Sequence, residues 1–203
     1  MNKLILLFVL IFSFFSCAQK EENIALKDSK EFQYKINLEY ADIKTSPLTK
    51  EDFKKFSSLN FFEINEELYV NADFIRTPNE ESFEMLTTTS RLAIYVKYGE
   101  AHFVIKDKKY KLNIYQSLSL KDDEEYKDYL FLPFTDLTNN KESYAGGRYI
   151  DLSLNDIKDK KIIVNFNNAY NPYCAYNHKY SCPIPPSENH LEAKINAGVK
   201  KFH

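Results

Sequence analysis

The chain has 203 residues, of which 44% are hydrophobic, 15% aromatic and 28% charged, and its formal net charge is −2. This apolar content excludes an intrinsically disordered chain, and the length suits one domain with a sizeable core. A slightly acidic chain without a basic stripe also argues against nucleic acid as a partner.

Residues 1–16 have the pattern of a bacterial lipoprotein signal peptide. Lys3 supplies a short positive region, and residues 4–15 form an apolar run too short for a permanent membrane span. The end of this run, Phe14-Phe15-Ser16-Cys17, resembles a lipobox with Phe14 in place of the usual leucine. We therefore expect acylation of Cys17 and attachment by lipid to a membrane of the bacterial cell envelope, facing the periplasm or the surface. An ordinary secretory signal followed by an incidental cysteine is the alternative.

Two helices are predicted after a polar tether over residues 17–29. Apolar residues recur at helical spacing over residues 30–43, which predicts an amphipathic helix. Thr49, followed three residues later by Asp52, is a helix-start pattern for a short second helix over residues 51–57. Neither helix carries an evident catalytic group, so both are expected to pack on the body of the domain.

The hydrophobic period changes to 2 after residue 61, which predicts strands. Apolar residues recur at every second position over residues 68–75. Residues 91–116 are interpreted as a three-stranded antiparallel meander with breaks at Gly99 and at residues 106–109. The charged segment 118–128 is expected to be a solvated loop. Further strands are predicted over residues 129–134, 149–152 and 162–166.

Because no long helices alternate with these strands, a parallel sheet is not expected. The predicted fold is mainly β (α+β): an antiparallel curved sheet, barrel or sandwich, with N-terminal helices on one side. One globular domain is expected over residues 30–203. Pattern alone does not separate a barrel from a sandwich.

Residues 165–198 concentrate the unusual chemistry of the chain. Four of the seven prolines lie here, and both cysteines outside the signal region do too. Because proline fixes φ and removes a backbone donor, the segment is neither helix interior nor central strand. We expect a long ordered loop that packs as a lid or a binding wall.

The sequence Gly146-Gly147-Arg148 is a second notable pattern. Paired glycines allow a close backbone approach or a positive φ, and Arg148 offers a planar fork of donors. The pattern lacks the spacing of a phosphate loop. Arg148 is therefore expected to pair with an internal carboxylate, either Glu188 or Asp151, with an anionic ligand as the alternative partner.

Two long stretches, residues 133–152 and 164–198, resemble an uncharacterised bacterial family, number sixteen eighty-four among the catalogued domains of unknown function. The resemblance covers residues 46–198, with departures at Asn165, where aspartate is usual, and at Val199, where glutamate is usual. The family has no assigned activity, so the resemblance supports a fold and a site without supplying a function. The matching positions are Pro133, Phe134, Asp136, Thr138, Tyr144, Gly146, Gly147, Arg148, Tyr149, Asn167, Ala169, Tyr170, Asn171, Pro172, Cys174, Ala175, Tyr176, Cys182, Pro183, Pro185, Pro186, Glu188 and Asn189.

Cys174 and Cys182 enclose a seven-residue gap, and an envelope protein meets an oxidising compartment. We therefore predict a disulfide that pins the loop, worth about 2–3 kcal/mol. A zinc site that adds His178 and His190 has the right ligand types, but its spacing fits no established zinc pattern. A cysteine nucleophile activated by His178 is the third alternative. No metal and no cofactor are expected.

The remaining candidate site residues are carboxylates, amides and tyrosines of these motifs. Tyrosines of the loop could stack on a flat ligand, although such rings more often pack internally. The candidate general acids or bases are Asp136, Asp151 and Glu188. The candidate binding residues are Arg148, Tyr149, Asn167, Tyr170, Asn171, Tyr176 and Asn189.

No complete catalytic motif occurs in the sequence. We therefore expect an envelope lipoprotein whose β-rich domain binds a small-molecule or carbohydrate-like ligand or a partner protein. The alternative is an envelope hydrolase that uses Glu188 or Asp151 as the acid or base and Arg148 to hold an anionic group or transition state.

Overall fold

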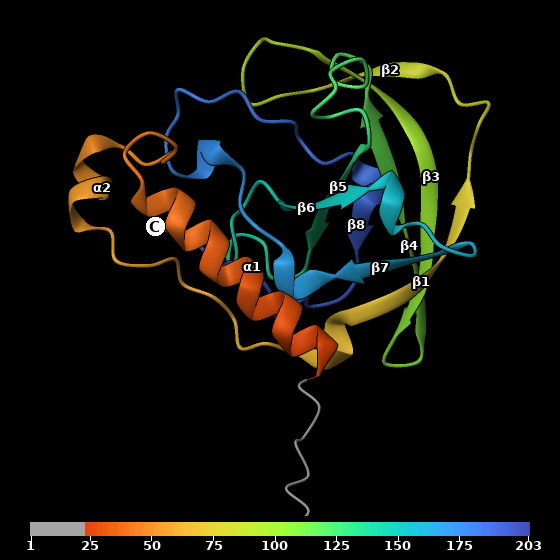
Figure 1. The fold of residues 1–203 in the computed structure, drawn as a ribbon, viewed down its shortest axis with the longest axis horizontal. Coiled ribbons are helices and arrows are strands. Elements are labelled where there is room, and N and C mark those ends of the chain that lie inside the picture. Colours follow the sequence, from red (N-terminus) through yellow and green to blue (C-terminus); the bar gives the residue numbers. More distant parts are fainter. Residues whose placement is uncertain (1–22) are drawn as a thin grey trace, which may run out of the picture.

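A computed structural model of the chain describes residues 23–203 and shows a curled antiparallel sheet that forms a half-barrel, flanked by two helices (Figure 1). The expected mainly β, antiparallel architecture is confirmed, and the curled sheet replaces the open choice between barrel and sandwich. The predicted signal peptide and Cys17 lie outside the described residues. Within the described part of the chain, no helix is long and apolar enough to cross a membrane.

Eight strands make up the sheet, in the order β6-β5-β4-β3-β1-β7, with β2 paired to β3 and β8 paired in parallel to β5. The strand β1 shows why the period-2 pattern was informative, since its buried residues alternate with exposed ones. The strands are β1 (Tyr69–Arg76), β2 (Ser82–Met85), β3 (Ala93–Ile105), β4 (Lys108–Ser117), β5 (Tyr129–Asp136), β6 (Arg148–Ser153), β7 (Lys161–Asn165) and β8 (His190–Leu191).

The expected three-stranded meander over residues 91–116 is wrong. The strand β3 runs through Gly99 without turning and pairs along its length with β4, so the region is a two-stranded hairpin. Gly99 instead marks a bulge, where the register shifts between Lys97 and Gly99. A Cβ atom at Gly99 would lie 2.5 Å from the Phe74 ring, so glycine permits close packing at this position and does not end the strand.

The first helix, α1 (Ile24–Ala41), begins six residues earlier than predicted, inside the segment expected to be a polar tether. Asn23 caps it by accepting a hydrogen bond from the Ala25 backbone N–H at 2.9 Å. Ala25 and Ser29 are buried in this first part of the helix. Because these side chains are small and weakly hydrophobic, the apolar period did not reveal the extension.

The second helix, α2 (Lys50–Lys55), begins where the sequence indicated. The Thr49 hydroxyl accepts a hydrogen bond from the Asp52 backbone N–H at 3.1 Å, which satisfies one of the free donors of the first turn. The helix ends two residues before the predicted boundary.

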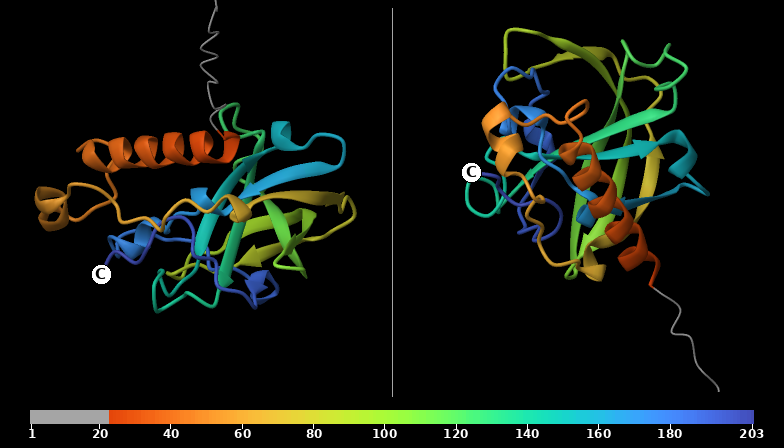
Figure 2. Two further views of the ribbon diagram at one scale, coloured as in Figure 1. Left: turned by 90° about the horizontal axis from the view of Figure 1, so that it is seen from below. Right: turned by 60° about the vertical axis from the view of Figure 1, so that its left-hand side comes forward.

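The helix α1 lies along one side of the half-barrel, as Figure 2 shows, and is fixed at both ends. Near its start, Asn165 at the end of β7 donates its amide to Asp28 at 2.7 Å and to Ser29 at 3.1 Å. Near its end, Ile36 and Tyr40 pack in an apolar cluster with residues of the C-terminal tail, here residues 166–203. Parts of the tail therefore pack directly against the end of α1.

The predicted ordered loop is an ordered, irregular segment that contains three short 3-10 turns and the strand β8. These turns are η3 (Phe166–Asn168), η4 (Tyr173–Ala175) and η5 (Ser187–Asn189). Tyr170 exchanges two backbone hydrogen bonds with Tyr149 of β6, at 2.9 and 3.0 Å, so the tail extends the sheet by a short bridge at its edge. The chain after β7 is thus built into the domain.

Candidate functional site

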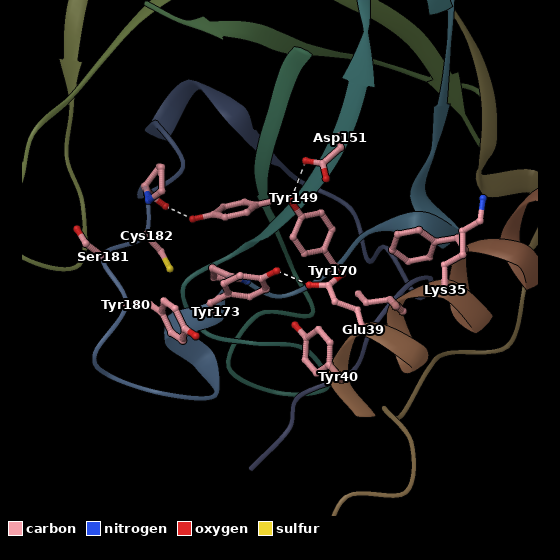
Figure 3. A pocket seen from close by; sticks show the side chains of 14 residues that line it. Lys35, Glu39, Tyr40, Tyr149, Asp151, Tyr170, Tyr173, Tyr180, Ser181 and Cys182 are labelled. Atoms are coloured by element: carbon pink, nitrogen blue, oxygen red, sulfur yellow. Dashed lines mark hydrogen bonds between the residues drawn. The ribbon is translucent and has the colours of Figure 1, made fainter. Parts of the chain in front are cut away.

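A cavity of about 400 Å³ opens between α1, β6 and the tail (Figure 3). This volume lies in the range of pockets that bind small molecules. We call it the tyrosine pocket, because six aromatic rings line it: Phe32, Tyr40, Tyr149, Tyr170, Tyr173 and Tyr180.

Local geometry explains how these side chains converge. On α1, Phe32, Ile36 and Tyr40 recur at a spacing of four residues and share one face of the helix. On β6, Tyr149 and Asp151 are two residues apart and point to the same side of the sheet. The bridge between β6 and the tail then brings the remaining rings opposite the helix.

Asp151 is the carboxylate at the β6 side of the tyrosine pocket. Its Oδ1 atom accepts hydrogen bonds from the hydroxyls of Tyr129 and Tyr170, both at 2.7 Å. Desolvation by the surrounding protein raises the pKa of Asp151. The hydrogen bonds from the two tyrosines lower this pKa, but they offset only part of the effect. The residue still has exposed surface, because it borders both the tyrosine pocket and a second cavity between β6 and β7.

The α1 side of the pocket carries a second carboxylate, Glu39. One of its oxygens accepts a short hydrogen bond from the Tyr173 hydroxyl. The neighbouring ammonium of Lys35 pairs with Glu31 at 2.6 Å, one turn away on the same helix. Tyr149 donates its hydroxyl proton to the carbonyl of Pro183, which fixes the tail wall of the pocket.

Arg148 is fully buried and does not face this pocket. Its guanidinium pairs with Asp136 at 2.7 Å and donates to the carbonyls of Ile195, at 2.8 Å, and Ala197. The expectation of an internal partner is therefore right in kind, but the partner is Asp136 and is neither Glu188 nor Asp151. Burial lowers the pKa of Arg148, while Asp136 counteracts the shift and keeps the charged form favourable.

Gly147, directly before this arginine, has a φ of +89°, as the paired-glycine pattern suggested. A Cβ atom here would lie 2.7 Å from the carbonyl oxygen of Phe134 and from Pro185. The glycine therefore permits the turn that delivers Arg148 into the interior.

The candidate binding amides are also interior groups that join the tail to the body. Asn189 has no exposed surface and donates to the carbonyls of Asn113 and Pro133 at 2.9 and 2.7 Å. Asn167 exchanges hydrogen bonds with the backbone of Asn65 at 2.8 and 2.9 Å. These contacts use the amides internally and leave little to offer a ligand.

Asn171 and Tyr176 are likewise buried. Asn171 donates to the carbonyl of Lys200 at 2.9 Å and to the Tyr176 hydroxyl at 3.3 Å. The Tyr176 ring packs edge-on against Tyr40, with ring centroids 5.0 Å apart. Both residues support the pocket from behind without lining it.

The three candidate acids or bases lie in three different places. Asp136 is buried in the ion pair with Arg148, and Asp151 faces the tyrosine pocket. Glu188 is exposed and lines a separate groove beside β2, where one of its oxygens accepts a hydrogen bond from Tyr115 at 3.3 Å. Of the predicted site residues, Tyr149, Asp151, Tyr170 and Cys182 share one cavity.

The two cysteines are buried neighbours, and both are free thiols in the structure, so the predicted disulfide is not formed in it. The backbone N–H of Cys174 donates to the sulfur of Cys182 at 3.2 Å. A hydrogen bond from the Cys182 thiol lowers the pKa of Cys174 and raises the pKa of Cys182. The disulfide stays a prediction.

The alternative zinc ligands do not assemble. His178 is exposed, and His190, the first residue of β8, shares a hydrogen bond with the Thr135 hydroxyl at 2.9 Å. Residues 23–203 contain no group of three or more histidine, cysteine, aspartate or glutamate side chains placed to hold a metal ion.

The helix wall of the site was not predicted from the sequence. The helix α1 was expected only to pack on the body, whereas Phe32, Lys35 and Glu39 line the pocket. The available indication was the spacing of four residues between Lys35 and Glu39, which places both beside the apolar row of the helix. Tyr129 was also missed, because it was read only as part of a strand.

Comparison with models of protein families identifies the family of this chain. The sequence model described as "Protein of unknown function (DUF1684)" matches residues 54–200. The chain belongs to the DUF1684 family. The resemblance that the sequence motifs indicated is therefore confirmed, and it brings no activity with it.

Among solved structures, this DUF1684 chain is similar to the uncharacterized protein from gene locus rrnAC0354 of Haloarcula marismortui, determined by solution NMR. The two are 28% identical, the match covers 86% of this chain and 92% of that chain, and the TM-score is 0.66. No curated protein matches the sequence. The comparisons thus support the half-barrel fold and leave the function to be argued from the site.

Replacing Arg148 with methionine in this DUF1684 domain should lower the free energy of unfolding by about 3–5 kcal/mol, because Asp136 would be left buried without its cation. Urea unfolding followed by circular dichroism measures the loss. The double variant Arg148→Met/Asp136→Leu should recover part of it. A single variant with an unchanged midpoint would show that the ion pair does not hold the tail.

The thiol pair should form an intramolecular disulfide when the purified protein is exposed to oxidised glutathione. Alkylation before and after reduction, read by mass spectrometry, counts the free thiols. Cys174→Ser provides the control, since it should give a mixed disulfide or a free thiol at Cys182. Two alkylated thiols in the oxidised wild-type protein would contradict this pairing.

Proposed function

We propose that this protein is a ligand-binding lipoprotein of the bacterial cell envelope, and that its small-molecule site is the tyrosine pocket. The observation that supports this most is a preformed cavity in which six aromatic rings and two carboxylates from separate segments converge. Apolar pockets with a few convergent polar groups are the usual architecture of small-molecule sites.

The pocket is organised before any ligand arrives. The hydroxyls of Tyr149, Tyr170 and Tyr173 each donate to a protein acceptor, so their rings are held in place. A site whose side chains are already ordered loses less entropy on binding. The ring faces suit a flat or carbohydrate-like ligand, because such molecules stack on aromatic surfaces.

The alternative of a hydrolase that combines Asp151 or Glu188 with Arg148 has no geometric support. The guanidinium of Arg148 is enclosed in the interior, and the two carboxylates border different cavities. Because a general acid or base and a transition-state anchor must reach the same substrate, the enclosed Arg148 is not placed to act with either carboxylate.

The envelope location rests on the lipobox-like sequence that ends at Cys17. Asn23 caps α1 only six residues later, so a lipid on Cys17 would hold the domain close to the membrane surface. Several acyl chains on one cysteine give stable anchoring.

Ligand binding can be tested with a thermal-shift fragment screen on residues 18–203, followed by NMR mapping of hits. Tyr173→Ala should weaken a true pocket ligand about tenfold, because a stacked ring and the contact that orders Glu39 are lost. Tyr34→Ala is the matched control, since Tyr34 lies on the outer face of α1 and is 65% exposed. Hits that bind Tyr173→Ala as well as wild type, or none at the pocket, would refute the proposal.

Lipidation can be tested by Cys17→Ser in the full chain. The variant should move from the membrane fraction to the soluble fraction, because the thiol that would carry the acyl chains is gone. Cys182→Ser keeps Cys17 and should stay with the membrane. Unchanged fractionation of Cys17→Ser would refute the anchor.

A further inference from the structure

We propose that the tyrosine pocket selects organic cations, with one or two ammonium groups contacting Asp151 and Glu39. This inference rests on the proposed function, since it names the chemical class of ligand for the same site. It follows from which polar groups the cavity leaves open.

The two carboxylates each keep one oxygen available. Both tyrosine hydroxyls that reach Asp151 bind its Oδ1, and Tyr173 occupies Oε1 of Glu39. Within the described residues, the other oxygen of each carboxylate has no hydrogen bond or ion pair. Figure 3 shows Tyr170 between these two groups, which come from β6 and α1. A ligand lying along the rings can therefore meet an acceptor at each end.

Positive charge in the pocket is already neutralised. Among the residues that line it, Lys35 is the one cationic side chain, and it pairs with Glu31 at 2.6 Å. The lining therefore carries two carboxylates against one paired ammonium. An anionic ligand would be repelled by the two carboxylates and would find no unpaired cation among the lining residues.

The tyrosine hydroxyls reinforce this polarity. Those of Tyr149, Tyr170 and Tyr173 use their single protons on protein acceptors, so they present only lone pairs to the cavity. An ammonium group offers donors without acceptors, which matches this arrangement. Aromatic faces also attract a cation through their negative quadrupole. A neutral polyol shares the stacking, but among the lining tyrosines only the hydroxyls of Tyr40 and Tyr180 are left to donate to its acceptors.

A series of probes with equal chain length separates charge from shape. We suggest NMR titration of residues 18–203 at low ionic strength with 1,4-diaminobutane, 1,4-butanediol and succinate. The diamine should shift resonances of residues that line the pocket and bind at least tenfold more tightly than the diol. Succinate should produce no shift there.

Charge-removing variants test the two acceptors. Glu39→Gln and Asp151→Asn each retain an oxygen for the tyrosine donors and should weaken diamine binding about tenfold. Asp122→Asn removes the same charge from the exposed loop 118–128 and should leave the affinity unchanged. A thermal melt of each variant establishes that it is folded. If Asp151→Asn unfolds, Glu39→Gln alone decides.

The outcomes distinguish the two proposals. Equal affinity for the diamine and the diol, or diamine binding that Glu39→Gln leaves intact, would overturn the cation preference while the pocket remained a ligand site. Absence of pocket shifts with the diamine, together with fragment hits that map there, would do the same. Absence of pocket shifts with every probe and fragment would overturn the proposed function as well.

Discussion

The structure depends on one buried ion pair, between Arg148 at the start of β6 and Asp136 at the end of β5. The same guanidinium reaches the carbonyls of Ile195 and Ala197, and Asp136 accepts the N–H of Ile195 at 3.2 Å. Because both charges are removed from water, each must be satisfied internally, and the tail supplies the missing partners. The pair thereby ties the end of the chain to two strands of the sheet.

That attachment creates the pocket indirectly. Once the tail is held at residues 195–197, its earlier part can bridge β6 at Tyr149 and face α1. The buried amides of Asn167 and Asn189 also attach the tail to the body, because they donate hydrogen bonds to backbone carbonyls of distant segments. The polar side chains of this region therefore have two separate roles. The guanidinium and the amides hold the tail, and the tyrosines and two carboxylates face the cavity.

Part of the site was predicted correctly from the sequence, and the errors in the rest have physical reasons. Tyr149, Tyr170 and Asp151 were predicted because they stand in distinctive motifs, and they do meet in one cavity. Arg148 was expected to pair with an internal carboxylate, and it does, but a guanidinium in a motif does not indicate which carboxylate it meets or how deeply it is buried. Glu39 was overlooked, because a helix face that packs on the body and one that lines a cavity have the same period.

What the sequence determined by itself was local. Alternation predicted most strands, Thr49 and Asp52 predicted the start of α2, and the prolines predicted an irregular tail, because propensity, capping and fixed φ act within a few residues. The tertiary structure decided that β3 continues through Gly99, that Arg148 pairs with Asp136, and that α1 forms one wall of the pocket. These features depend on how segments far apart in the chain pack, and that is set by the whole core rather than by neighbouring residues.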